Sequence, residues 1–364
     1  MYLAIRDLRF AKGRFLLMGG VVALITVLLV LLSGLTAGLG NQSISALAAL
    51  PADQIVFGAP AGGSAKASFT ESEVTRGQLS VWSGAEGVAR AELLGISQSR
   101  FQAVGTTGTP TGTASVAVFG TEGSGLAPAP VVDGTVVVGS SLARDLGLQA
   151  GSRATIGGTA LTVSSVVPDQ WYAHTGVIWT TLADWRTLAH IDAAGAAATV
   201  IAVTADTGHS PGTAATNTAA GTLSTTRDGS FQALGSYKSE NGSLLLMQAF
   251  LYGISALVIV AFLTVWTVQR TRDIAVLKAL GGSSGYVLRD AMVQAAIVLL
   301  TGAAAGGAVG IAGGAFASRA VPFLLTPNTT VLPVAGIVVL GLAGAALATR
   351  GVTRVDPLLA LGGN

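Results

Sequence analysis

Hydrophobic positions gather in four long stretches, one near the N-terminus and three near the C-terminus, with a long segment of mixed character between the first and second. Segments 15–52, 244–268 and 291–318 contain no charged residue, and 331–349 is shorter and rich in Gly and Ala. The hydrocarbon core of a bilayer needs about 20 apolar residues of helix. The pattern therefore predicts four transmembrane helices, with one large domain inserted between helices 1 and 2.

The inserted segment has short β-like runs separated by Gly, Pro and Ser. These predict strands at 115–120, 135–139, 154–157, 161–167, 177–181 and 199–204, and a short helix at 140–148. The fold class is thus a membrane α-helical protein with a large α+β extracytoplasmic domain. The predicted order is a cytoplasmic amphipathic segment at 1–14, helix 1 and an outward stalk at 15–50, the extracytoplasmic domain at 51–243, helix 2 at 244–268, a cytoplasmic loop at 269–290, helix 3 at 291–318, an outer loop at 319–330, helix 4 at 331–349 and a cytoplasmic tail at 350–364.

The basic residues predict the orientation, because Lys and Arg are retained on the cytoplasmic side. Segments 1–14 and 269–290 carry four each, whereas the loop 319–330 has only Arg319. Segment 41–243 has nine Lys or Arg against fourteen Asp or Glu. Both termini are therefore expected in the cytoplasm and the large domain outside. The high Gly and Ala content resembles that of bacteria with GC-rich genomes, which suggests a bacterial cytoplasmic membrane.

The first hydrophobic stretch has an alternative interpretation as a cleaved signal peptide, because basic residues precede it. Its apolar part, 15–39, is longer than the usual h-region of about 7 to 15 residues, so a retained helix is predicted. The basic segment before it suits either an amphipathic helix on the membrane surface or a simple positive flank.

Several kinds of chemistry are excluded by what the sequence lacks. There is no cysteine, so disulfides and thiolate metal sites are ruled out. None of the four lysines follows a Gly, so no P-loop can cradle ATP. The hydrophobic stretches carry no ionisable residue of the kind that relays protons or sodium. Net charge follows the membrane topology and gives no support to nucleic-acid binding. Any transport would need a partner that hydrolyses nucleotide.

The loop 269–281 reads Gln-Arg-Thr-Arg-Asp-Ile-Ala-Val-Leu-Lys-Ala-Leu-Gly and sets apolar positions among charges. A short helix of this kind can lie on the membrane or place its apolar face in a partner's groove. The loop closely resembles the signature of FtsX/MacB-type permeases of ABC transporters, Glu-Arg-x-x-Glu-Ile-Ala-x-Leu-Arg-Ala-x-Gly. Matching positions are Arg270, Ile274, Ala275, Leu277, Lys278, Ala279 and Gly281, while Gln269 and Asp273 stand for the two Glu residues.

This resemblance covers most of the chain, since that family also has four transmembrane helices with its outer domain after the first. Segment 138–151, with the paired strands after it, resembles the α/β core of that domain. The resemblance implies a homodimeric permease bound to two copies of a cytoplasmic ABC ATPase, which binds ATP and Mg²⁺. The chain itself would be no enzyme and would hold no intrinsic cofactor. The expected coupling residues are Arg270, Asp273, Ile274, Leu277, Lys278 and Gly281.

Segments 5–14, 169–179 and 230–240 resemble the haem-exporting HrtB subgroup of the family. This resemblance points to Tyr172 and Tyr237, and ferric haem accepts a Tyr oxygen, a His nitrogen or a Met sulfur as axial ligand. Tyr237 and Glu240 stand about one helical turn apart. The predicted haem-binding residues are Tyr172, Tyr237, His174, Glu240, Lys238 as a propionate contact, and Met247 as a soft contact.

Each of these residues also has a structural interpretation. Tyrosine is common at membrane interfaces, and Tyr172 with its neighbouring Trp residues is equally suited to covering a core. His174 and Met247 suit hydrogen bonding and helix packing. Two other functions stay open: export of a peptide, lipid or hydrophobic drug, and a signalling subunit that regulates an extracellular hydrolase. The second should show an exposed apolar patch on the outer domain.

Overall fold

A computed structural model of the chain describes residues 12–60, 62–105, 108–123, 125–191, 196–208, 212–269 and 283–352. It divides into two compact units. The helical unit comprises Met1–Leu39 and Ser243–Asn364, and the β-rich unit comprises Gly40–Gly242.

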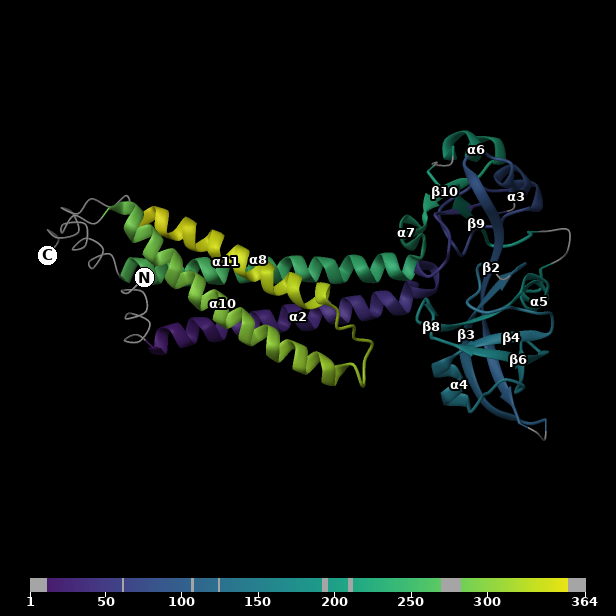
Figure 1. Ribbon diagram of the computed structural model, residues 1–364, viewed down its shortest axis with the longest axis horizontal. Coiled ribbons are helices and arrows are strands. Elements are labelled where there is room, and N and C mark those ends of the chain that lie inside the picture. The colour runs from purple at the N-terminus through teal and green to yellow at the C-terminus, as the bar shows by residue number, and fades with distance from the viewer. Residues whose placement is uncertain are drawn as a thin grey trace. The chain divides into compact units, whose positions relative to one another are not determined.

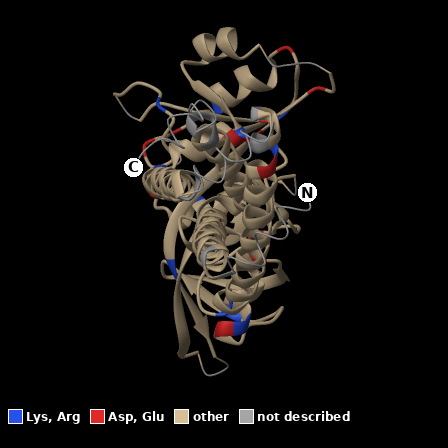
Figure 2. Ribbon diagram, turned by 90° about the vertical axis from the view of Figure 1, so that its left-hand side faces the viewer, with Lys and Arg blue, Asp and Glu red and all other residues tan. Residues whose placement is uncertain are grey.

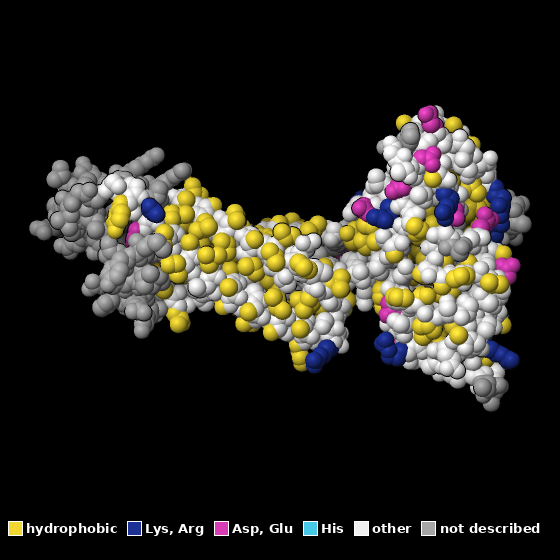
Figure 3. Space-filling view, in the orientation of Figure 1, with side chains coloured by type: hydrophobic (Ala, Val, Ile, Leu, Met, Phe, Trp, Pro, Cys, Tyr) yellow, Lys and Arg dark blue, Asp and Glu magenta, His cyan; other side chains and the backbone are white. Residues whose placement is uncertain are grey.

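The helical unit contains four helices that are long and apolar enough to cross a membrane (Figure 1). They are α2 Lys12–Ala48, α8 Gly235–Gln269, α10 Ser284–Ala317 and α11 Pro327–Val352. Figure 2 marks the charged residues, and none falls within 15–39 or 291–318. On the face seen in Figure 3, charged side chains of this unit lie only near its ends. The predicted helical part of the fold class is confirmed.

Close approach between α2 and α10 depends on glycines spaced four residues apart. A Cβ atom added at Gly306 would overlap the carbonyl oxygen of Ala23, and one added at Gly302 would lie 2.8 Å from the carbonyl oxygen of Gly19. Small residues at this spacing let membrane helices pack backbone to backbone. The Gly content of the third hydrophobic stretch thus has a packing function.

The β-rich unit is built on one sheet in the order β10-β1-β9-β2-β3-β8-β4-β6-β5, with β7 paired to β8. The strands are β1 Gln54–Phe57, β2 Val88–Val104, β3 Pro110–Thr121, β4 Thr135–Gly139, β5 Arg153–Ile156, β6 Thr159–Val167, β7 Trp171–Tyr172, β8 Thr175–Thr181, β9 Val200–Ala205 and β10 Leu223–Thr226. Helices α3 Arg76–Ser83, α4 Ser140–Leu146, α5 Leu182–Leu188, α6 Thr213–Ala220, α7 Arg227–Ser230 and the 3-10 turn η1 Phe231–Ala233 connect them.

Strand β2 belongs to two parts of this sheet. Its first half pairs with β9, and its last four residues pair with β5, so the path from β2 through β3, β8, β4, β6 and β5 returns to β2. This ring encloses a core that includes Phe101, Val118 and Ile178. A second core, with Phe57, Phe119 and Trp179, also includes Leu47 from the end of α2. The end of α2 is therefore held by the same apolar packing as the sheet.

All six predicted strands are confirmed, as β3, β4, β5, β6, β8 and β9, and the predicted short helix is α4. Two predicted bounds are off by one residue, since β5 ends at Ile156 and β9 begins at Val200. The α+β part of the fold class is therefore also confirmed. Helix α2 continues beyond the predicted membrane run and ends at Ala48, while the outward stalk stays a prediction. Residues 1–11, which hold most of the expected amphipathic segment, lie outside the described residues.

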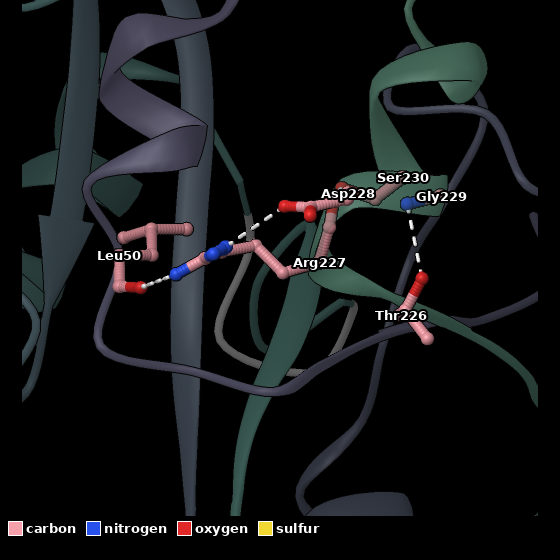
Figure 4. A network of polar contacts seen from close by, with 6 residues as sticks. All are labelled: Leu50, Thr226, Arg227, Asp228, Gly229 and Ser230. Atoms are coloured by element: carbon pink, nitrogen blue, oxygen red, sulfur yellow. Dashed lines mark hydrogen bonds and ion pairs between the residues drawn. The ribbon is translucent and has the colours of Figure 1, made fainter.

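A polar network ties the end of α2 to the segment that leads into α8 (Figure 4). Arg227, at the start of α7, donates to the carbonyl oxygen of Leu50 at 3.3 Å and to the carboxylate of Asp228 at 3.3 Å. The Thr226 side chain accepts from the Gly229 amide at 3.1 Å and so caps α7. The exit from one long helix and the entry to the next are therefore fixed beside each other.

Candidate functional site

The candidate site is built around the turn between β7 and β8. Tyr172 pairs with Thr175, which leaves Ala173 and His174 as a two-residue turn. Both have a positive φ, 48° and 62°. Such a turn suits the twist of a hairpin but favours Asn and Gly, because other residues at positive φ cost roughly 1 to 3 kcal/mol each. The turn is therefore strained.

Contacts with α2 hold the strained turn. The amide of Ala173 donates to the carbonyl oxygen of Ser43, and the amide of His174 donates to that of Gln42, both at 3.0 Å. Two residues before Ala173, the Trp171 amide donates to the Ser45 hydroxyl at 2.9 Å. The hairpin is thus fixed to the last turns of α2 by three backbone donors.

The His174 side chain joins three elements of the β-rich unit. Its Nε2 atom lies 2.9 Å from Glu240 Oε2, in the first turns of α8, and 3.1 Å from Ser43 Oγ, on α2. The side chains of His174 and Glu240 are 36 % and 31 % exposed. With its proton on Nε2, the imidazole donates to the carboxylate, which accepts. The structure thus brings together two of the predicted residues, His174 and Glu240.

Tyr172 lies in the second core and is 5 % exposed. Its ring packs edge-on against Phe119 and Phe69, with centroids 5.5 and 6.0 Å apart. Burial raises the pKa of its hydroxyl, which disfavours the phenolate form. In this position the ring stabilises the hairpin from within.

Tyr237 is half-buried on the first turn of α8. Its ring packs edge-on against Phe231, 6.3 Å away, and a Cβ atom added at Gly40 of α2 would lie 3.7 Å from its Cε2 atom. The ring therefore covers the backbone of α2. Lys238, the next residue, is exposed.

The remaining predicted residues lie elsewhere. Met247 is 54 % exposed on α8, in the helical unit. It begins an exposed apolar stripe on that helix with Phe250, Ile254 and Leu257. The predicted coupling residues Arg270, Asp273, Ile274, Leu277, Lys278 and Gly281 all lie outside the described residues.

The helical unit also has an apolar groove of about 350 Å³ between α2 and α8. Only apolar side chains line it, among them Met18, Val22, Ala261 and Phe262. Elsewhere along the same helix pair, the Gln248 amide donates to the Thr36 hydroxyl at 3.0 Å. The α2 and α8 pair therefore offers both an apolar groove and a polar link.

Sequence reasoning missed Ser43 and Gly40, the α2 residues of the site. The only indication was the change from Leu and Val to Asn41-Gln-Ser-Ile-Ser before the stalk ends. It also missed the local function of Asp169, whose carboxylate accepts from the amide of Ser141 at 2.7 Å and so caps α4. Gln170 likewise accepts from the Trp179 ring nitrogen at 2.7 Å. Most of segment 169–174 therefore has a structural partner.

Two family models match the chain. The MacB-like periplasmic core domain matches residues 14–220, which is more than half of the chain, and the FtsX-like permease C-terminal domain matches residues 245–357. The first match contains the β-rich strands up to β9, and the second contains most of α8 with α10 and α11.

Curated relatives match over shorter segments. A putative hemin transport system permease protein HrtB of Staphylococcus haemolyticus is 32 % identical over 130 residues, 36 % of this chain and 37 % of that protein. One of Staphylococcus epidermidis is 29 % identical over 143 residues, 39 % of this chain and 41 % of that protein. The chain therefore spans about two fifths of the length of these relatives.

Two solved structures are distantly similar. The periplasmic region of MacB from Actinobacillus actinomycetemcomitans has a TM-score of 0.36 at 11 % identity, covering 50 % of this chain and 92 % of that one. The extracellular domain of the noncanonic ABC-type transporter YknZ from Gram-positive bacteria has a TM-score of 0.34 at 13 % identity, covering 48 % and 99 %. At TM-scores this low, neither structure contributes to the family assignment, which rests on the two family models. The chain belongs to the FtsX/MacB family of ABC-type transporter permeases.

Proposed function

We propose that this permease subunit exports haem from the membrane to the outside, driven by a separate cytoplasmic ABC ATPase. One observation carries the proposal. Segments 169–179 and 230–240 resemble the haem-exporting subgroup, and although they lie far apart in sequence they meet through the 2.9 Å contact between His174 and Glu240. The relatives named as putative hemin transport permeases support the same cargo.

The proposed haem contacts lie where α2 enters and α8 leaves the β-rich unit. Glu240 and His174 are partly exposed there, and Tyr237 covers Gly40 beside them. Lys238 is proposed to meet a propionate, and Met247 to offer a soft contact deeper along α8. Tyr172 contributes through its buried ring, since a ligand function would require the core around Phe119 to open.

The proposed assembly is a homodimer of this chain with two ATPase subunits in a bacterial cytoplasmic membrane. Its termini and the loop 269–290 face the cytoplasm. Arg270, Asp273, Ile274, Leu277, Lys278 and Gly281 are the proposed ATPase contact. Exposed apolar residues lie along α8, such as Phe250 at 64 % and Leu257 at 69 %. They support entry of haem from the side, out of the lipid, because haem dissolved in lipid would meet this apolar face of α8.

The test of haem export is a haem titration of the purified full chain together with haem resistance of cells. We expect a saturable Soret change, and growth on toxic haem that requires both the chain and its ATPase. Cells with Tyr237→Phe should lose part of that resistance. Equal haem sensitivity with and without the chain would contradict the proposal. Charge reversal at Arg270 and Lys278 should prevent copurification of the ATPase.

A second candidate function, export of a hydrophobic drug or lipid, is favoured by the groove between α2 and α8, which has only apolar lining residues. Such a cargo needs no iron ligand. Ala261→Trp would fill the groove and should abolish resistance to that cargo, whereas Ala308→Trp, at an exposed position of α10, should not. If neither variant changes resistance to any hydrophobic compound, this candidate fails.

A further inference from the structure

We infer that His174 binds the iron of the transported haem through its Nδ1 atom, while Glu240 holds the opposite ring nitrogen. The inference rests on the proposed haem export and assigns the residue that selects for an iron porphyrin. It replaces the pair of tyrosines, to which the sequence resemblance points, with a histidine and its carboxylate.

The hydrogen bonds of His174 leave one nitrogen available. Both contacts of the ring, with Glu240 at 2.9 Å and Ser43 at 3.1 Å, involve Nε2. Among the residues that the structure describes, Nδ1 has no hydrogen-bond partner. A histidine that binds a metal usually donates its other N–H to a carboxylate, which fixes the tautomer and raises the basicity of the ligand nitrogen. Glu240 already stands in that position.

The two tyrosine hydroxyls are less available as iron ligands. Tyr172 is 5 % exposed, and its raised pKa opposes the phenolate that ferric iron prefers. Tyr237 lies between the Phe231 ring and the backbone at Gly40. The His174 side chain is 36 % exposed at the tip of a hairpin. The imidazole is therefore more accessible to a ligand than the buried Tyr172 hydroxyl.

The backbone conformation of His174 also supports a function for its side chain. His174 has a φ of 62°, in a turn whose geometry favours Gly. Strain at a non-Gly residue tends to be retained where the side chain has a function. The three hydrogen bonds from the hairpin to α2 fix this turn, so the ring is held in one place. A fixed ring is what an axial ligand requires.

The binding step is a ligand exchange without electron transfer. The Nδ1 lone pair forms a bond to ferric iron, and the water or weaker ligand on that face of the porphyrin leaves. The proton on Nε2 stays between the imidazole and the Glu240 carboxylate. The carboxylate thereby offsets the positive charge that the ring gains from the iron.

His174→Gly is the decisive variant, because Gly is the residue best suited to a φ of 62° and the hairpin should keep its fold. The full chain in lipid nanodiscs is titrated with hemin, and the Soret band and the electron paramagnetic resonance spectrum are recorded. We expect at least about tenfold weaker binding and a shifted Soret band. Added imidazole should enter the vacant space and restore the wild-type spectrum.

The matched control is His190→Gly. His190 is also exposed and also has a positive φ, 55°, but it follows α5 away from the hairpin. Its removal should leave the hemin titration unchanged. Glu240→Gln should keep the position of the Soret band but weaken binding by roughly tenfold, as for other outer-shell partners.

The outcomes separate the two proposals. Wild-type chain without any saturable Soret change would overturn haem binding itself and this assignment with it. Wild-type binding that His174→Gly leaves unchanged would overturn only the assignment of His174. Loss of binding that imidazole does not restore would also overturn it, because His174 would then have only a structural function. An equal loss of binding in His190→Gly would overturn it as well, because the loss would then be a general effect of removing a histidine.

Discussion

The helical unit and the β-rich unit use the same large apolar residues in opposite ways. In the β-rich unit, Trp82, Trp179 and Trp185 are at most 2 % exposed. In the helical unit, Phe250 is 64 % exposed and Phe316 is 75 % exposed. The first surrounds its apolar groups with protein, and the second presents them to lipid, where no hydrophobic force drives helices together. What holds each unit together must therefore differ.

The difference shows in the use of glycine. In the β-rich unit, Gly95 and Gly120 leave room for one large side chain, because a Cβ atom on either would overlap Trp185. In the helical unit, Gly306 leaves room for another backbone, that of α2 at Ala23. At these positions the missing side chain makes room for an aromatic ring in the β-rich unit and for a neighbouring helix backbone in the helical unit.

The largest expected effect is the loss of a buried aromatic ring. Trp185→Ala should lower the free energy of unfolding of the β-rich unit by about 3 to 5 kcal/mol, since it leaves a cavity over Gly95 and Gly120. Phe250→Ala, an exposed aromatic of α8, should change stability by well under 1 kcal/mol in a lipid environment. Denaturant unfolding of both variants in nanodiscs checks this. Equal losses would mean that α8 is covered by protein.

The next effect concerns backbone contact between helices. Gly306→Ala should destabilise the helical unit by about 1 to 3 kcal/mol, because the overlapping atoms belong to the α2 backbone and cannot rotate away. Gly313→Ala on the same helix is the control, since its Cβ atom would lie 3.7 Å from Leu31. Thermal aggregation in detergent distinguishes them. A tolerated Gly306→Ala would mean that α2 and α10 are further apart.

A smaller effect on stability depends on pH and concerns the core of the β-rich unit. Burial raises the pKa of Tyr172 above its unfolded value of about 10. Its contribution to stability is therefore complete below about pH 10 and is lost at higher pH, by up to about 1.4 kcal/mol per pH unit. Tyr172→Phe should remove this part of the alkaline destabilisation. The measurement is the denaturation midpoint of both forms between pH 9 and pH 11, chosen as roughly one unit on each side of the unfolded pKa. Parallel curves would contradict a buried Tyr172.

The two units also differ in how far the sequence predicts them. The bilayer requires about 20 apolar residues per helix, so all four helices follow from hydrophobicity alone. The strand β2 was not predicted, since Arg90, Glu92 and Arg100 interrupt its apolar pattern. Its pairing with β5 and β9 supplies the stability that local propensity does not.

Only the part of the candidate site that lies on a single helix could be predicted from the sequence. Glu240 and Tyr237 share one helix, so their spacing of about one turn follows from the sequence. Ser43 and His174 are 131 positions apart, and only the docking of the hairpin on α2 brings them together. The burial of Tyr172 depends on rings from other strands, including Phe119 of β3. Contacts of this kind have no local pattern.

The smallest expected effect on stability is that of a polar pair in the helical unit, which can be compared with a buried polar pair in the β-rich unit. The link between Gln248 and Thr36 should contribute only about 0.6 kcal/mol in a double-mutant cycle with Gln248→Leu and Thr36→Val, since polar groups in a membrane also find partners when helices separate. The bond from the Trp82 ring nitrogen to Thr222, 3.1 Å, is buried in the β-rich unit. There Thr222→Val leaves a buried donor without its partner and should cost about 1 to 3 kcal/mol. If the membrane pair proved the stronger, this polar contact would be a main tie between α8 and α2, and cargo passing between these two helices would have to break it.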